Sequence, residues 1–181
     1  MKIRFIINPI SGTGKQKGIQ EYIAKYIKDF EIIYTREAGD ATRISKEAAI
    51  KNFDAVVAVG GDGTVNECLK GLINTNTALG VIPCGSGNGF AYHIGMKRKI
   101  EQAIIQLQDT RIEQIDSCSA NGAPFVNVSG IGFDAHIAKL FVKLKNRGFI
   151  NYVMLILKEL SYTPKEYNIK YDGIERKVTA Y

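Results

Sequence analysis

The stretch Asp54-Ala55-Val56-Val57-Ala58-Val59-Gly60-Gly61-Asp62-Gly63-Thr64-Val65-Asn66-Glu67 is the most informative part of this 181-residue chain. Its first half is apolar and rich in β-branched residues, which is typical of a central parallel strand that helices cover on both faces. Its second half is a glycine loop followed by a helical pattern over residues 64–72. Backbone N–H groups and the positive end of a helix therefore meet at the loop, where a phosphate can lie against bare backbone.

Asp62 interrupts the glycines of this loop, and a tight turn alone would not explain an aspartate there. A carboxylate repels phosphate when the two are in direct contact. Asp62 is therefore predicted to hold Mg²⁺ or order water beside the phosphates, or else to accept a proton.

Two more glycine loops follow predicted strands. One is Pro83-Cys84-Gly85-Ser86-Gly87-Asn88-Gly89-Phe90-Ala91, and the other is Asn8-Pro9-Ile10-Ser11-Gly12-Thr13-Gly14-Lys15. Neither spells a Walker A loop or a Rossmann fingerprint, because Pro9, Gln16 and Phe90 stand where those motifs need other residues. Loops at the carboxyl ends of neighbouring parallel strands border one crevice. Three glycine loops at one edge therefore favour a nucleotide-binding fold other than the Walker A and Rossmann folds. For the loop after residue 82, a flexible connector is the alternative interpretation.

Strand and helix patterns alternate over the first two thirds of the chain. Strands are predicted at residues 4–7, 31–35, 54–59 and 79–82, and helices at residues 18–30, 40–48, 64–72 and 100–107. This order predicts an α/β fold in three layers, with a doubly wound parallel sheet.

The pattern changes near residue 111. Asn121-Gly122 and Asp172-Gly173 each stand between β-like stretches and predict two antiparallel hairpins. Helices are predicted between them, at residues 135–145 and 149–160. We therefore predict a nucleotide-binding domain at residues 1–116, and at residues 117–181 the beginning of an antiparallel β-sandwich domain that is mostly missing.

These motifs together resemble the catalytic domain of the diacylglycerol kinase family, which includes bacterial diacylglycerol kinases and the sphingosine and ceramide kinases. The glycine-aspartate-glycine-threonine core is also shared with NAD kinases. The matching residues are Asn8-Pro9 with Ser11-Gly12, Thr35 with Gly39-Asp40-Ala41, Gly60 to Thr64 with Asn66-Glu67, Pro83 to Ala91, and Asn127 with Gly132-Phe133-Asp134-Ala135.

The resemblance implies an ATP-dependent and Mg²⁺-dependent kinase that transfers the γ-phosphoryl group to a hydroxyl of diacylglycerol, a sphingoid base or a related lipid. It implies Asp62 as the catalytic residue and Mg²⁺ ligand, and Asp134 and His136 on the substrate side. The implied ATP contacts are Asn8, Pro9, Ile10, Ser11, Gly12, Thr35, Gly60, Gly61, Asp62, Gly63, Thr64, Val65, Asn66, Ser86 and Asn88.

The chain departs from the family pattern in two places. Gly89 follows Asn88 where many bacterial members have aspartate, and the resulting sequence is more similar to that of the sphingosine kinases. Most of the family's C-terminal domain is also expected to be missing. The chain alone is therefore expected to bind nucleotide, and it need not be active as a kinase. A NAD kinase-like enzyme and a non-catalytic nucleotide-binding module remain the alternatives.

Charge gathers toward the C-terminal end: residues 117–181 hold nine Lys and Arg against five Asp and Glu, in a chain with net charge +6. An apolar stripe at Ile137, Leu140, Phe141 and Leu144 beside lysines suits peripheral membrane contact through residues 135–147, or packing on a core.

No aromatic RNA-binding platform is present, so nucleic acid is not an expected partner. Homodimer formation is left open. Three scattered cysteines and no signal segment predict a cytoplasmic protein, with peripheral contact at the inner membrane face.

Overall fold

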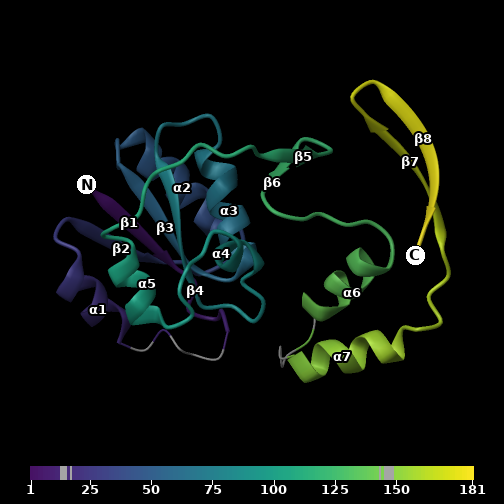
Figure 1. Ribbon diagram of the computed structural model, residues 1–181, viewed down its shortest axis with the longest axis horizontal. Helices are drawn as coiled ribbons and strands as arrows, with labels where there is room; N and C mark the ends of the chain where they lie inside the picture. The colour runs from purple at the N-terminus through teal and green to yellow at the C-terminus, as the bar shows by residue number, and fades with distance from the viewer. Residues whose placement is uncertain (13–15, 17, 143, 145–148) are drawn as a thin grey trace. The chain divides into compact units, whose positions relative to one another are not determined.

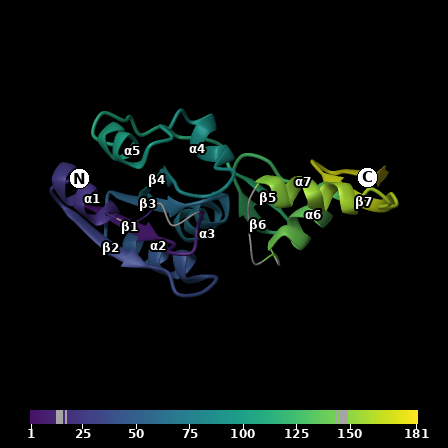
Figure 2. The same cartoon turned by 90° about the horizontal axis from the view of Figure 1, so that it is seen from below.

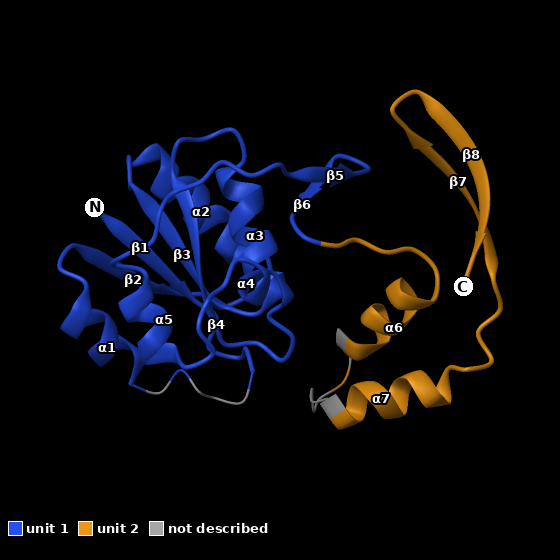
Figure 3. Cartoon of the chain, viewed as in Figure 1, with its two compact units in different colours: residues 1–127 blue, residues 128–181 orange. Residues whose placement is uncertain are grey.

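The structure, a computed structural model, describes residues 1–12, 16, 18–142, 144 and 149–181. Its contacts divide into two compact units, residues 1–127 and residues 128–181, which Figure 3 shows in blue and orange. Each unit is described by itself.

A parallel sheet with the strand order β2-β1-β3-β4 forms the centre of the first unit (Figure 1). Its strands are β1 (Ile3–Ile7), β2 (Phe30–Tyr34), β3 (Ala55–Gly60) and β4 (Ala78–Pro83). The carboxyl ends of these strands lie level, because Ile7 pairs with both Tyr34 and Val59, and Gly60 pairs with Pro83. The strand order reverses between β1 and β3, and open α/β sheets bind ligands at such a point.

Helices cover both faces of this sheet, which confirms the predicted three-layer α/β fold. In Figures 1 and 2, α1 and α5 lie on one face, and α2 and α3 lie on the other. β1 and β3 are buried along their whole length as a result. The helices are α1 (Ile19–Tyr26), α2 (Asp40–Ile50), α3 (Asp62–Leu72), α4 (Gly89–His93) and α5 (Ile100–Gln106).

Two details differ from the sequence prediction. The helix predicted over residues 18–30 ends at Tyr26, because Phe30 already pairs with Ile3 as the first residue of β2. The short helix α4 was not predicted, since five residues are too few to show a periodic apolar pattern.

The first unit ends at Asn127, eleven residues beyond the predicted boundary at 116. A short hairpin of β5 (Cys118–Ala120) and β6 (Ala123–Phe125) follows α5, and β6 packs against α3. The predicted turn is present, with positive φ angles at Asn121 and Gly122 (50° and 78°). The hairpin therefore belongs to the first unit.

The second unit holds a helix pair and an antiparallel hairpin. The helices α6 (Phe133–Val142) and α7 (Phe149–Lys158) pack on each other. The strands β7 (Lys165–Tyr171) and β8 (Ile174–Ala180) pair around the predicted Asp172-Gly173 turn. Within the described residues, no helix is both long enough and apolar enough to cross a bilayer.

Candidate active site

The three glycine loops arrive at the same edge of the sheet. The N–H of Asn8, just after β1, donates to the carbonyl of Val59 on β3 (3.0 Å). The N–H of Cys84, just after β4, donates to the carbonyl of Gly60 (2.8 Å), and the N–H of Thr35 donates to the end of β1 (2.9 Å). The loops that follow β1, β3 and β4 therefore start side by side.

The loops also touch one another through glycines. A Cβ on Gly12, which has φ +67°, would collide with the carbonyl oxygen of Cys84. A Cβ on Gly85 would collide with the Cα of Gly61. Glycine is needed at these contacts because any side chain would push the loops apart. The three loops are therefore packed directly against one another.

Asn8 holds the first loop in place. Its Nδ2 donates to Oγ1 of Thr64 on α3 (3.2 Å), and its Oδ1 accepts the N–H of Ile10 (3.1 Å). The side chain of Gln16 closes the loop by donating to the carbonyls of Asn8 (3.1 Å) and Ser11 (2.6 Å). Pro9 and Ile10 are exposed, and residues 13–15 of the same loop lie outside the described residues.

Asp62 is the first residue of α3, and it reaches across to the loop after β4. The helix begins where the carbonyl of Gly61 accepts the N–H groups of Thr64 (3.0 Å) and Val65 (3.1 Å). The side chain of Asp62 is exposed, and its Oδ1 accepts the N–H of Phe90 (3.1 Å). The carboxylate is thus fixed at the junction of two glycine loops, and its Oδ2 lies near Gly87.

Asn88 shapes the loop after β4 from within. Its backbone is left-handed (φ 58°), and its side chain is buried. The amide accepts the N–H of Gly85 and donates to the carbonyl of the same residue, both at 2.7 Å. Ser86, at the tip of the loop, is exposed. Of these two predicted nucleotide contacts, Ser86 is the one whose side chain is available to a ligand.

Asp40 fixes the turn that follows β2 and Thr35. Its Oδ2 accepts the N–H of Arg36 (2.9 Å), and its Oδ1 accepts a hydrogen bond from the guanidinium of Arg43 (2.7 Å). The hydrogen bond from Arg43, followed by that from the Arg36 backbone, lowers the pKa of Asp40 below its ordinary value. The charged form of Asp40 therefore stabilises this turn.

We expect Asp40→Asn to lower the melting temperature at neutral pH, with a deficit that shrinks in acid. A carboxylate whose pKa is lowered by folding contributes stability above its unfolded pKa and loses it as pH falls through the folded pKa. Thermal melts followed by circular dichroism from pH 7 to about pH 3 measure both effects. Asp109→Asn, at an exposed position, is the control. A deficit that stays constant with pH would contradict the assignment.

Glu67 connects the turn after β2 to α3. Its Oε2 accepts the N–H of Gly39 (3.0 Å), and its carbonyl accepts the hydroxyl of Thr42 (2.9 Å). One turn of helix separates Glu67 from Asp62. The turn after β2 and the catalytic candidate are therefore held by the same helix.

Two buried side-chain oxygens near the loops have no donor among the described residues: Oδ1 of Asn66 and Oε1 of Gln16. Buried acceptors are nearly always paired in native proteins. Both oxygens are shielded from solvent, so a ligand lying on the loops would not reach them without a local rearrangement.

A model of the diacylglycerol kinase catalytic domain matches residues 2–120, a span that contains all three glycine loops. The chain belongs to this family. The match with relatives extends further than the family model, as the following comparisons show.

A diacylglycerol kinase of Bacillus subtilis strain 168 is 36% identical in an alignment 188 positions long, which covers 95% of this chain and 60% of the relative. A diacylglycerol kinase of Mycobacterium tuberculosis H37Rv is 32% identical in an alignment 186 positions long, which covers 96% of this chain and 60% of the relative. The crystal structure of a diacylglycerol kinase from Bacillus anthracis strain Sterne matches 99% of this chain and 61% of that chain, at 32% identity and a TM-score of 0.73. The chain thus spans about three fifths of the length of these relatives.

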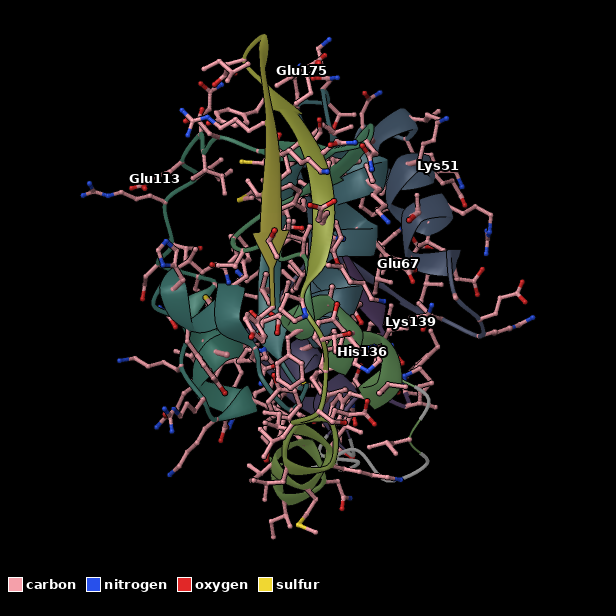
Figure 4. The ribbon with its side chains drawn as sticks, turned by 90° about the vertical axis from the view of Figure 1, so that its right-hand side faces the viewer. Lys51, Glu67, Glu113, His136, Lys139 and Glu175 are labelled. Atoms are coloured by element: carbon pink, nitrogen blue, oxygen red, sulfur yellow. The ribbon has the colours of Figure 1, made fainter. Side chains whose placement is uncertain are left out.

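Asp134 and His136, the predicted substrate-side residues of this kinase-family chain, both lie on α6 in the second unit. Asp134 is exposed, in the first turn of the helix. Nε2 of His136 lies 2.7 Å from Oε2 of Glu159, and its ring packs on Tyr162 with centroids 5.0 Å apart. Figure 4 labels His136 and Lys139 on the same helix. No sequence pattern indicated the partner Glu159, because 23 residues separate it from His136.

Sequence reasoning also missed four residues of the first unit. The N–H of Phe90, the side chain of Gln16, the carboxylate of Glu67 and the amide of Asn127 all lie at the loops. Glu67 and Asn127 stand inside the family motifs, so their position was a usable signal. Gln16 and Phe90 were considered only as departures from other motifs, and no pattern marks them otherwise.

Proposed function

We propose that this chain forms the nucleotide-binding part of an ATP-dependent lipid kinase, which transfers the γ-phosphoryl group to a hydroxyl of diacylglycerol, a sphingoid base or a related lipid. The observation that carries the proposal is the convergence of three glycine loops on one exposed aspartate, Asp62. Membership of the diacylglycerol kinase family supports the same reaction.

The loops are suited to hold the phosphates of ATP. Gly12, Gly61 and Gly85 let the three loops lie against one another, and α3 points its positive end toward the same place. Phosphoryl transfer needs mainly positioning and charge neutralisation from the protein. We assign the ATP contacts to residues 8–12, Thr35, residues 60–66 and Ser86, and we give Asn88 the task of shaping its loop.

Mg²⁺ fits this site with a small protein contribution. The described residues contain no group of three or more His, Cys, Asp or Glu side chains that could form an all-protein metal cage. Magnesium in kinase sites is held by one or two carboxylates together with substrate phosphates and water. Asp62 can supply such a carboxylate, and Mg²⁺ bound there would neutralise charge on the phosphates.

Asp62 has a second possible task, because its Oδ2 is exposed and makes no hydrogen bond within the described residues. A carboxylate in this position can accept the proton of an attacking hydroxyl. The hydrogen bond from the N–H of Phe90 to Oδ1 fixes the orientation of the carboxylate.

Transfer of label from γ-labelled ATP with Mg²⁺ tests the proposal. The acceptors are diacylglycerol, a sphingoid base, monoacylglycerol and NAD, the lipids being presented in mixed micelles. A labelled lipid is the expected result, and labelled NAD would favour the NAD kinase-like alternative. ATP binding with no labelled acceptor would favour a non-catalytic nucleotide-binding module.

We further propose that the second unit contacts a lipid surface through α7. The inner face of α7 packs on α6, where Tyr152 meets Phe141 edge to face (5.4 Å). The predicted stripe on α6 is thus partly covered by α7, and Lys143, Lys145 and Arg147 lie outside the described residues. The outer face of α7 is apolar, as is Leu160 two residues beyond it, yet these side chains are between 36% and 76% exposed, at Ile150, Val153, Met154, Leu157 and Leu160.

The charge around α7 favours an anionic bilayer as the partner. Lys158 is exposed at the end of the helix, Lys165 is exposed at the start of β7, and α7 itself contains no acidic residue. An apolar helix face flanked by lysines binds anionic membrane surfaces through both burial and charge. The proposed location is accordingly the cytoplasmic face of a membrane, with peripheral contact.

The double change Met154→Glu with Leu157→Glu is expected to reduce binding to phosphatidylglycerol vesicles by about tenfold or more, because it places charge on the exposed apolar face that would enter the bilayer. Vesicle sedimentation measures the bound fraction. Ile112→Glu with Ile115→Glu, at exposed positions of the first unit, is the matched control and should bind as the unchanged protein does. Equal binding by the α7 variant would contradict the proposal, and light scattering would reveal a homodimer formed through this face instead.

A further inference from the structure

Gln16 stands between the glycine loop after β1 and the first residue of α1, and it is hydrogen-bonded to both. Its side-chain Nε2 donates to the carbonyls of Asn8 (3.1 Å) and Ser11 (2.6 Å). Its own carbonyl accepts the N–H of Ile19 (3.1 Å), whose side chain is buried in the core. The carbonyls of the loop are therefore tied to a residue that the core holds in place through α1.

The amide of Gln16 fits this contact in one orientation. An amide nitrogen carries two hydrogens, one for each carbonyl, whereas an amide oxygen carries none. The reverse orientation would set Oε1 against the carbonyl oxygens of Asn8 and Ser11. In the observed orientation, Oε1 is shielded from solvent and has no donor among the described residues.

Stability alone does not account for an amide at position 16. A buried acceptor without a donor is unfavourable for folding, so the orphaned Oε1 offsets part of what the two hydrogen bonds contribute. An apolar side chain of the same length would avoid that cost. The carbonyl of Asn8 would keep a donor in that case, because it also accepts the N–H of Ser11 (3.2 Å).

The contact decides which backbone groups this loop offers to a phosphate. Carbonyl oxygens carry partial negative charge and repel phosphate, whereas N–H groups attract it. Gln16 directs the carbonyls of Asn8 and Ser11 at a covered side chain, so these oxygens are withdrawn from any anion that approaches the loop. The same loop is braced on its other sides by the bond from Asn8 to Thr64 and by the contact of Gly12 with the loop after β4.

We propose that Gln16 is a positioning residue for nucleotide binding, which keeps the carbonyls of Asn8 and Ser11 away from the phosphates. Gln16 touches no phosphate and acts only through the loop after β1. The inference rests on the proposed kinase function and adds to it a residue outside the family motifs. It also explains the departure from a Walker A loop, in which a hydroxyl that meets Mg²⁺ stands at this position. Here an amide that binds backbone takes its place.

Three variants test the assignment. Gln16→Met keeps the length of the side chain and removes both donors together with the orphaned oxygen. Gln16→Lys keeps donors for two carbonyls, because an ammonium group carries three hydrogens. Gln20→Met is the matched control, since it makes the same change on α1, where Nε2 of the exposed Gln20 donates to the hydroxyl of Tyr34 (2.7 Å).

Calorimetric titration with ADP and thermal melts separate positioning from stability. Gln16→Met should raise the dissociation constant for ADP about tenfold or more, as for the loss of hydrogen bonds that shape a binding site. Its melting temperature should stay within about 3 °C of that of the unchanged chain. Gln16→Lys should keep the dissociation constant within about threefold of the unchanged value or lower it. Gln20→Met should leave ADP affinity unchanged.

NMR of the ¹³C-labelled chain without nucleotide checks the contact itself. The carbonyl signals of Asn8 and Ser11 should shift in Gln16→Met, because their donor is gone, and should move back toward their original positions in Gln16→Lys. Unchanged carbonyl signals in Gln16→Met would show that the amide does not hold the loop, which would overturn the inference.

Three results of the titrations would also overturn it. The first is equal ADP affinity in Gln16→Met and the unchanged chain. The second is a loss of affinity in Gln16→Lys as large as that in Gln16→Met. The third is a fall in the melting temperature of Gln16→Met by about 10 °C or more, which would mark Gln16 as a structural residue. Absence of ADP binding by the unchanged chain would instead overturn the proposed function and this inference with it, so the two failures are distinguishable.

Discussion

Asp62→Asn is expected to lower the rate of phosphoryl transfer by about a thousandfold, as for the loss of a positioned general base or metal-binding carboxylate. Asparagine has nearly the same shape, and its side-chain oxygen can still accept the N–H of Phe90, so the loop should keep its structure. Without metal, ADP should bind at least as tightly as before, because a negative charge beside the phosphates has been removed. With Mg²⁺, that advantage should disappear.

The measurement combines labelled-phosphate transfer with calorimetric ADP titrations in the presence of either EDTA or Mg²⁺. Asp109→Asn is the control, because it removes one exposed carboxylate beyond α5 and should change neither quantity. If Asp62→Asn kept more than about a tenth of the transfer rate, Asp62 would be neither the base nor a required metal ligand.

Gly12→Ala is expected to abolish nucleotide binding, with a loss of affinity of at least about a hundredfold. The Cβ would meet the carbonyl oxygen of Cys84, so the loop after β1 and the loop after β4 could not stay in contact. The left-handed backbone at φ +67° adds a cost of about 1–2 kcal/mol for any residue with a side chain. The phosphate-binding surface needs both loops in place, and it would lose its shape.

Gly18→Ala separates these two effects. Gly18 also has positive φ (78°), but a Cβ there meets nothing within 4 Å. This control should lose about 1–2 kcal/mol of stability from the backbone alone and keep its affinity for ADP. Urea unfolding and ADP titration of the two variants give the comparison. Equal nucleotide affinity in both variants would show that the contact between the loops is dispensable.

The sheet and its helices could be predicted from local pattern because each element repeats a periodic signal. β3 is apolar on both faces, α1 and α5 show helical spacing of apolar residues, and glycine loops separate strand from helix. The aspartate within the loop after β3 stands out for the same local reason. The alternation of strand and helix also predicts that the glycine loops lie together at the carboxyl ends of the parallel strands.

The boundary at residue 116 was placed too early because it relied on a change of local pattern. β5 and β6 look like the start of an antiparallel domain, yet β6 packs on α3 and belongs to the first unit. The burial of Arg4, the first residue of the strand predicted over residues 4–7, is likewise not indicated by any local pattern. Its guanidinium is buried, pairing with Glu31 (2.6 Å) and donating to the carbonyl of Ile44 (3.1 Å).

The sequence by itself determined the α/β architecture, the three glycine loops and the aspartate between them, because strand periodicity, glycine and charge act over a few neighbouring residues. Only the tertiary structure decided which side chains form hydrogen bonds within the loops and which remain available to a ligand. Asn88 turned out to hold its own loop, while Asn127 lies beside Gly89 and Asp62. Such contacts join residues far apart in the chain, and their geometry depends on how β6, α3 and the loop after β4 pack together.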